Sequence, residues 1–266
     1  MVTSGGIYLA DAEDTVLFLC DKKMGKVPIG IAIEDFSALT EALKIKNGER
    51  FWYRENMLGF SGGILVIEPI PMPEEEKISP PVNLLLVKQA GEELLALASP
   101  RGLAALVGPL VLGGERDGIL SKNPYAKEAY PHLFRLKQCL SKGDAEAVYA
   151  SATALFGLGL GLTPSADDVL LGMIYTFHRF SYETPASRAI CRAVALEAPR
   201  RTNRISAAYL QAVVEGESFY RMERVLQGLV GQIPLEIREL TELGSSSGGE
   251  MLLGVLIALD IFYNMI

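Results

Sequence analysis

The sequence has few of the residues on which many enzyme classes depend. Only two of its 266 residues are histidines, and only three are cysteines. Cys20, Cys139 and Cys191 are far apart and include no Cys-x-x-Cys pair, which argues against a disulfide framework and a thiol-based metal site. His132 and His178 have no second ligand at zinc spacing. We therefore expect neither a histidine-based triad nor a zinc site.

Long runs of positive charge and of hydrophobic residues are also missing. The net charge is −7, and no segment is rich in lysine or arginine, so we expect no nucleic-acid partner. The longest strongly apolar segment, residues 251–259, is too short to span a bilayer and ends at Asp260. The N-terminus lacks the basic and apolar regions of a secretory signal. We expect a cytoplasmic protein without a membrane segment.

A glycine-rich loop stands out in the second half of the chain. Gly157, Gly159 and Gly161 allow positive φ angles and a close approach of the backbone to another group. Thr163 and Pro164 follow, a pair that predicts a helix start with the threonine hydroxyl as cap. The loop therefore leads directly into a helix.

Two acids lie in the first turn of that predicted helix. Asp167 and Asp168 are placed where carboxylates favour the positive end of the helix dipole. Residues 169–175 behind them are almost wholly apolar, so we expect a buried helix. A glycine loop and two acids at the start of a buried helix indicate a binding site.

The same pattern occurs a second time. Residues 165–172 align without gaps on residues 247–254, and both segments read Ser-x-x-acid-x-Leu-Leu-Gly. The pattern is close to a capping box before an apolar run, so either copy alone is as readily a well-capped core helix as a site. Two copies together favour a paired site that contains Asp168 and Glu250.

The order of predicted elements indicates an α+β fold with two domains. Residues 5–70 read as short strands with one helix at 37–44, a spacing that suits a small barrel or sandwich. Five prolines and an acidic run follow between residues 69 and 81, where we expect a linker. Residues 1–80 are thus predicted to form a β-rich domain, and residues 81–266 a mostly helical domain that carries the glycine loop.

The helical half contains three polar helix starts, at residues 163–168, 202–206 and 245–250. Helix N-termini present unpaired N–H groups, so with Arg204 they can hold an anion. The acids Asp167, Asp168 and Glu250 are candidates for catalysis, since carboxyl groups orient amides and transfer protons. The candidate ligand-binding residues are Gly159, Gly161, Thr163, Ser165, Thr202, Asn203, Arg204, Ser206, Ser245, Ser246, Ser247 and Gly248. A site of this kind suits a small substrate with an anionic end and an amide end.

These three segments resemble a bacterial family whose best-known branch is the AllH-type subunit of oxamate carbamoyltransferase. The family pattern is Gly-x-Gly-x-Gly-Leu-Thr-Pro-Ser-Gly-Asp-Asp, then Thr-x-x-x-Ser, then Gly-His-Ser-Ser-Gly-x-Asp-x-Leu-x-Gly. Residues 157–168 match the first element, with Ala166 in place of a glycine. Thr202 and Ser206 match the second element. The resemblance covers most of residues 157–254.

The third element departs from the family pattern at two positions. Ser245 stands where histidine is usual, and Glu250 stands where aspartate is usual. The missing histidine puts in doubt any role that family members give to that residue.

The resemblance implies a transferase subunit that works with partner subunits, one of them of the FdrA type. Such an enzyme moves a carbamoyl group between phosphate and the amide nitrogen of oxamate. In the degradation of allantoin, phosphate attacks oxalurate and releases oxamate and carbamoyl phosphate. The resemblance therefore implies a small anionic ligand such as carbamoyl phosphate or oxamate. We expect no cofactor, with Mg²⁺ as the alternative.

Two other functions fit the residues. The chain is then either a binding or assembly subunit without chemistry, or an enzyme that binds a nucleotide or phosphate through Mg²⁺ held by the paired acids. The nucleotide- or phosphate-binding enzyme is the weaker of these two alternatives, because Gly157-x-Gly-x-Gly161 lacks the spacing of a P-loop or a dinucleotide fingerprint.

Overall fold

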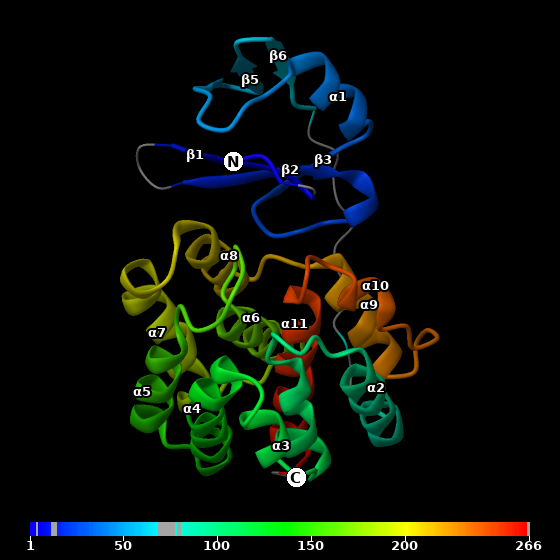
Figure 1. The fold of residues 1–266 in the computed structure, drawn as a ribbon, viewed down its shortest axis with the longest axis vertical. Helices are drawn as coiled ribbons and strands as arrows, with labels where there is room; N and C mark the ends of the chain where they lie inside the picture. Colours follow the sequence, from blue (N-terminus) through cyan, green and yellow to red (C-terminus); the bar gives the residue numbers. More distant parts are fainter. Residues whose placement is uncertain (4, 12–14, 69–77, 79–80, 265–266) are drawn as a thin grey trace. The chain divides into compact units, whose positions relative to one another are not determined.

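The computed structural model describes residues 1–266 except residues 4, 12–14, 69–77, 79–80 and 265–266. The chain divides into two compact units, residues 1–76 and 77–266 (Figure 1). Most of the proline-rich segment in which we expected a linker lies outside the described residues.

The first unit contains two three-stranded sheets and one α-helix. In one sheet, β1 (Gly6–Ala10) pairs antiparallel with β2 (Val16–Asp21), and β2 pairs parallel with β3 (Gly30–Ile33). A 3₁₀ turn, η1 (Lys22–Met24), follows β2, and α1 (Phe36–Leu43) follows β3. In the other sheet, β4 (Trp52–Arg54), β5 (Met57–Phe60) and β6 (Gly63–Val66) are antiparallel in chain order.

One hydrophobic core serves both sheets and α1. Its buried members come from β1, β2, α1 and β5, and they are Ile7, Leu9, Leu19, Leu43, Leu58 and Phe60. Alternate residues of these strands point inward, because side chains of a strand alternate between its two faces. The predicted α+β class is confirmed, and the predicted small barrel or sandwich takes the form of two separate three-stranded sheets.

The second unit is helical throughout its described part. Its elements are α2 (Leu84–Leu97), η2 (Ala104–Leu106), the π-helical η3 (Gly108–Leu112), α3 (Asp117–Leu120), α4 (Pro124–Lys142), α5 (Ala145–Leu155), α6 (Ser165–Arg179), α7 (Pro185–Arg201), α8 (Arg204–Val214), α9 (Tyr220–Leu229), α10 (Arg238–Thr241) and α11 (Ser247–Asn264). Within the described ranges, no helix is both long enough and apolar enough to cross a membrane.

Capping side chains define where several of these helices begin. Asn123, Asp144 and Asn203 each accept a hydrogen bond from the backbone N–H three residues later, as N-cap residues do. Thr184 forms a capping box with Ser187 at the start of α7. The polar residues between the apolar runs thus explain the observed helix boundaries.

Helices α6 and α11 form the centre of this unit and make its most extensive helix–helix contact (Figure 1). A Cβ atom on Gly172 of α6 would lie 2.0 Å from the carbonyl oxygen of Met251 in α11. A Cβ atom on Gly254 of α11 would lie 2.0 Å from the carbonyl oxygen of Val169 in α6. These four residues occupy matching positions of the repeated sequence pattern, so the two copies pack against each other with approximate two-fold symmetry.

Candidate functional site

The glycine loop before α6 has the backbone geometry that its sequence predicts. Gly157, Gly159 and Gly161 have φ angles of +81°, +109° and +113°, a region that other residues rarely adopt. A Cβ atom on Gly157 would lie 2.5 Å from the carbonyl oxygen of Arg201. The Asn203 side-chain amide donates to the carbonyl oxygen of Leu162 at 2.8 Å. The loop is therefore fastened to the junction between α7 and α8.

Thr163 does not have the role that we predicted for it. No side chain caps α6, whose N-cap position is held by Pro164. The Thr163 hydroxyl instead donates to Asp168 Oδ2 at 2.9 Å and lies 3.1 Å from Ser247 Oγ. The predicted cap is wrong because this hydroxyl is used in a side-chain contact that spans the starts of α6 and α11.

Asp167 connects the glycine loop to the start of α8. Its Oδ1 accepts from the Gly157 N–H at 3.0 Å, and its Oδ2 accepts from the hydroxyls of Thr202 and Ser206, the latter at 2.7 Å. Burial raises the pKa of Asp167, and the hydrogen bonds from Thr202, Gly157 and Ser206 oppose that rise. Asp167 thus holds together elements that are far apart in sequence, while its predicted catalytic role stays a prediction.

Asp168 and Glu250 form a pair of buried acids where the starts of α6 and α11 meet. Their exposed fractions are 2% and 0%. The pKa of Asp168 is raised well above its ordinary value, mainly by burial and secondly by repulsion from Glu250. Hydrogen bonds from the hydroxyls of Ser247 and Thr163 lower this pKa and so oppose the rise. Burial raises the pKa of Glu250 to about 7. The two carboxyl groups therefore hold protons more tightly than ordinary acids do.

Glu250 also contacts a segment that the sequence did not connect with the site. Its Oε1 accepts from the Leu103 N–H at 2.9 Å, whereas its Oε2 has no hydrogen-bond partner among the described residues. The Ser246 and Ser165 hydroxyls are near enough to lower the pKa of Glu250, but neither makes a hydrogen bond of good geometry to Oε2. A Cβ atom on Gly102 would lie 2.1 Å from Oε1, so Gly102 makes room for this carboxyl group. No motif around residues 100–104 signals this role.

The structure brings the three predicted helix starts together. Asp167 joins α6 to α8, and the contact between Thr163 and Ser247 joins α6 to α11. Ser165, Ser206 and Gly248 are buried, while Asn203, Arg204 and Ser245 are exposed. Among the residues that the structure describes, no group of three or more His, Cys, Asp or Glu side chains is arranged to hold a metal ion.

The backbone N–H groups at these helix starts already donate within the chain. Ala166 donates to Leu158, and Asp167 and Asp168 donate to Pro164. At α11, Gly248 donates to Leu243, and Gly249 and Glu250 donate to Ser246. Hydrogen bonds of this kind leave fewer N–H groups to hold an anion than a bare helix start offers.

The raised pKa of Glu250 predicts that stability depends on pH. A carboxyl group with a pKa of 4.5 when unfolded and about 7 when folded binds its proton more tightly in the folded state. The stabilisation that this proton binding gives to the folded state is complete below pH 4.5 and is lost as the pH rises through about 7. We expect this group to lower the free energy of unfolding by about 3–4 kcal/mol over that range, since one pKa unit corresponds to about 1.4 kcal/mol.

Urea unfolding at a series of pH values measures this effect. Glu250→Gln should flatten the decline, whereas Glu242→Gln, which makes the same chemical change at an exposed position, should keep it. Equal pH profiles for the wild type and Glu250→Gln would contradict the assignment.

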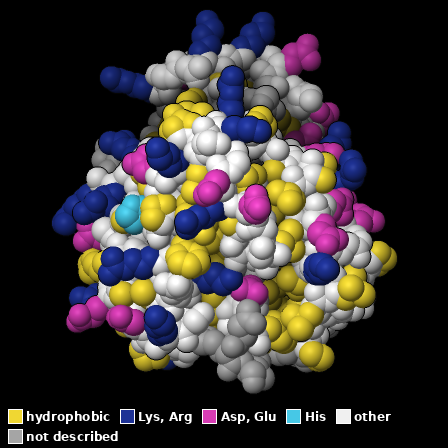
Figure 2. Space-filling model, turned by 60° about the horizontal axis from the view of Figure 1, so that its bottom comes forward, with side chains coloured by type: hydrophobic (Ala, Val, Ile, Leu, Met, Phe, Trp, Pro, Cys, Tyr) yellow, Lys and Arg dark blue, Asp and Glu magenta, His cyan; other side chains and the backbone are white. Residues whose placement is uncertain are grey.

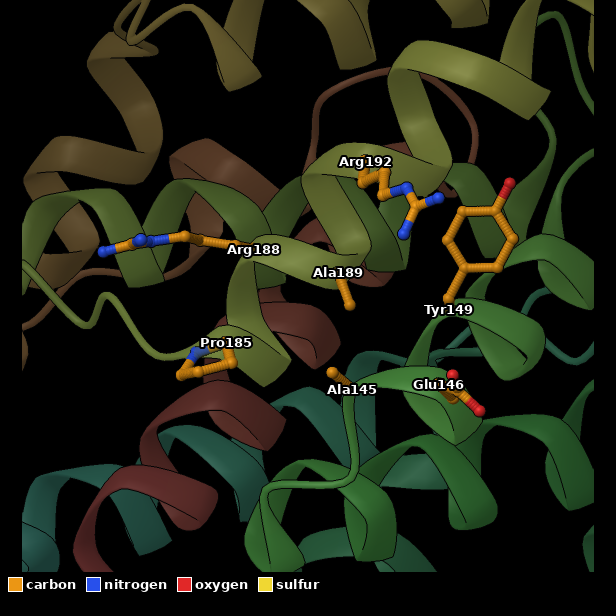
Figure 3. A pocket seen from close by; sticks show the side chains of 7 residues that line it. All are labelled: Ala145, Glu146, Tyr149, Pro185, Arg188, Ala189 and Arg192. Atoms are coloured by element: carbon orange, nitrogen blue, oxygen red, sulfur yellow. The ribbon is translucent and has the colours of Figure 1, made fainter.

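A cavity of about 540 Å³ lies elsewhere in this unit, between the first turns of α5 and the first half of α7 (Figure 3). In Figure 3, Arg188 extends away from Tyr149 and Glu146, and it pairs with Glu183 at 3.3 Å. Arg192 lies over the Tyr149 ring, 5.4 Å from its centre. The charged groups of this cavity therefore do not converge on a common point.

A second cavity, of about 250 Å³, is lined by residues of α6, α7 and the turn between them, such as Phe177 and Cys191. Asp167, Asp168 and Glu250 line neither cavity. Sequence reasoning did not anticipate these cavities, because their linings come from ordinary amphipathic helices.

The helical unit thus defines a class of protein in which two glycine-packed helices bring a pair of buried acids together beside a glycine loop. Residues 155–259, which carry all these features, match the family model described as "Oxamate carbamoyltransferase subunit AllH". This part of the chain is similar to the AllH family, and the predicted resemblance is confirmed over these residues. No solved structure matches the chain.

Proposed function

We propose that this chain is a subunit of an oxamate carbamoyltransferase and that its ligand site lies at the starts of α6, α8 and α11. The observation that carries the proposal is the family match over residues 155–259, since this segment contains the glycine loop and all three predicted acids. The reaction moves a carbamoyl group between phosphate and the amide nitrogen of oxamate.

The chemistry of the residues at these helix starts suits such a reaction. Carbamoyl transfer develops negative charge on the carbamoyl oxygen, which hydrogen-bond donors stabilise. The hydroxyls of Thr163 and Ser247 lie beside the acid pair and can rotate to donate to this oxygen in place of their present partners. The exposed Arg204 and Ser245 supply a cation and a hydroxyl for the anionic part of the substrate. Asp168 is suited to orient the amide or to take its proton, because a raised pKa brings a carboxyl group closer to neutral pH.

Partner subunits are part of the proposal, and an FdrA-type chain is the partner that we expect. Two leucines of the glycine loop, Leu160 and Leu162, are 44% and 38% exposed, which leaves apolar surface beside the site. The face shown in Figure 2 carries small groups of hydrophobic side chains between Lys, Arg, Asp and Glu. A cytoplasmic location stays a prediction from the unpaired cysteines.

Reconstitution of the complex tests this function. The full chain would be co-expressed with an FdrA-type subunit and the third subunit, and carbamoyl phosphate formed from oxalurate and phosphate would be measured. We expect activity only when this chain is present, and a loss of at least about tenfold in kcat for Asp168→Asn in complexes that still assemble.

Two results would contradict the proposal. Full activity of the partner subunits without this chain would remove it from the enzyme. An Asp168→Asn complex with unchanged kcat would instead favour a binding or assembly subunit without chemistry. Glu242→Gln, at an exposed position, is the control for both measurements.

A further inference from the structure

The most unusual polar atom in the helical unit is Glu250 Oε2. The side chain is fully buried, its other oxygen is occupied by the Leu103 N–H, and Oε2 has no partner among the described residues. A buried polar atom without a hydrogen bond costs about 1–3 kcal/mol, so such atoms are rare unless they serve a ligand or hold water. This oxygen is therefore a candidate contact for a substrate.

The surroundings of Glu250 favour a single proton on the acid pair. Asp168 lies close to it on α6, and the negative charge of Glu250 raises the pKa of Asp168. The other groups that act on Glu250 are neutral donors, namely the Leu103 N–H and the hydroxyls of Ser246 and Ser165. Asp167 is engaged on the opposite side, by Gly157, Thr202 and Ser206. Two buried carboxyl groups with neutral donors around them do not both ionise readily.

A carboxyl pair with one proton has a definite hydrogen-bonding character. The protonated group donates one hydrogen bond, and the ionised group accepts. A primary carboxamide is the matching partner, because its carbonyl accepts and its NH₂ group donates. A carboxylate or phosphate offers only acceptors and would repel the ionised acid.

We infer that the Asp168–Glu250 pair, with one proton between its carboxyl groups, binds the neutral carboxamide end (–CO–NH₂) of the substrate rather than its anionic end. In the bound state we place the proton on Glu250 Oε2, because Asp168 already accepts from the Thr163 hydroxyl whereas Oε2 has no hydrogen-bond partner among the described residues. Glu250 Oε2 then donates to the carbonyl oxygen, and Asp168 accepts from the NH₂ group. This inference rests on the proposed function, whose carbamoyl donor and oxamate both carry such a group.

The residues around the acid pair agree with a substrate whose carboxamide end lies at the acids and whose anionic end lies outside. The N–H groups of residues 166–168 in α6 and of residues 248–250 in α11 already donate to carbonyl oxygens of the chain, so these helix starts are not bare anion sites. Thr163 and Ser247 are partly exposed, and they contact each other and Asp168. In the proposed complex the carboxamide therefore approaches Asp168 from the side of these two hydroxyls. The anionic end then lies outside, where Arg204 and Ser245 are exposed.

Oxamate and oxalate provide a matched pair of probes, since they differ only in whether one end is a carboxamide or a carboxylate. Their dissociation constants would be measured by calorimetry on the full chain at pH 6.5 and pH 8.5. We expect oxamate to bind at least about tenfold more tightly than oxalate at pH 6.5. We expect oxamate affinity to fall at pH 8.5, where the pair loses its proton.

Two variants of Glu250 separate hydrogen bonding from shape. Glu250→Gln keeps a donor and an acceptor, so it should keep the preference for oxamate and lose the dependence on pH. Glu250→Met is similar in size but has neither group, so the preference should fall below about twofold. Glu242→Gln should behave as the wild type does.

Several outcomes would overturn the inference. Equal affinity for oxamate and oxalate, no binding of millimolar oxamate, or an unchanged pH dependence in Glu250→Gln would each do so. The last result decides the matter even if Glu250→Met fails to fold. Carbamoyl transfer that depends on this chain but shows none of this selectivity leaves the proposed function standing and removes the inference. Selective binding of oxamate without any transfer activity would support carboxamide binding by the acid pair and would remove the proposed transferase function.

Discussion

Gly172→Val should unfold most of the helical unit. Its Cβ atom would lie 2.0 Å from the carbonyl oxygen of Met251, a backbone atom of the central helix α11, and real Cβ atoms essentially never approach another atom within 3.0 Å. Helices α6 and α11 would have to separate by more than 1 Å along a wholly buried contact. We expect a loss of at least about 4 kcal/mol, which is close to the total stability of many domains.

A matched control is available for this substitution. Gly118 lies in the short helix α3, and a Cβ atom there would have no atom within 4 Å, so Gly118→Val should change stability by less than about 0.5 kcal/mol. Far-UV circular dichroism follows the helices during urea unfolding, while the single tryptophan, Trp52, reports on the first unit. Gly254→Val should match Gly172→Val, because the two glycines are equivalent in the repeated pattern. If Gly172→Val were as stable as Gly118→Val, the close crossing of the helices would be wrong.

Much of this fold could be read from local sequence signals. Cap residues such as Asn203 mark helix starts, so the helix expected at residues 37–44 and the three expected helix starts fall close to their observed positions. The positive φ angles of Gly157, Gly159 and Gly161 could likewise be predicted from the sequence, because only glycine adopts them without strain. These features depend on residues that are neighbours in the chain.

The repeated Ser-x-x-acid-x-Leu-Leu-Gly pattern gave the most distant expectation. It led us to expect a paired site that contains Asp168 and Glu250. The structure packs the two segments together through Gly172 and Gly254, while the site itself stays a prediction. The repeat alone could not show how closely the helices cross. That Gly172 and Gly254 lack side chains predicts a close helix crossing only when the backbone that faces each glycine is known.

The parts of the site that could not be predicted depend on contacts between distant segments. Leu103 and Glu250 are 147 residues apart, and nothing in either segment indicates that a backbone N–H meets that carboxyl group. The roles of Asp167 and Asp168 likewise could not be separated from sequence. They are adjacent on one helix, yet one faces α8 and the other faces α11, because successive residues of a helix point about 100° apart.

This division of roles leads to a prediction for Asp167, which we grouped with the catalytic acids on sequence alone. Asp167→Ala removes the acceptor for the Gly157 N–H and for the hydroxyls of Thr202 and Ser206. Donors left buried without a partner each cost about 1–3 kcal/mol, and part of this is offset because the carboxyl group itself is unfavourably buried. We expect a net loss of about 3–4 kcal/mol, or a melting temperature lower by about 10 °C for a unit of this size.

Asp167→Asn distinguishes a connecting role from a catalytic one. The amide keeps one acceptor oxygen, and the hydroxyls of Thr202 and Ser206 can rotate to accept from its NH₂ group, so the loss should be only about 1–2 kcal/mol. If Asp167 holds the loop and α8 in place, activity of the reconstituted complex should follow stability and recover in Asp167→Asn when the temperature is lowered. A stable Asp167→Asn protein whose activity does not recover on cooling would show instead that the carboxylate itself takes part in the reaction. The two variants together therefore decide whether the acid pair of Asp168 and Glu250 acts alone.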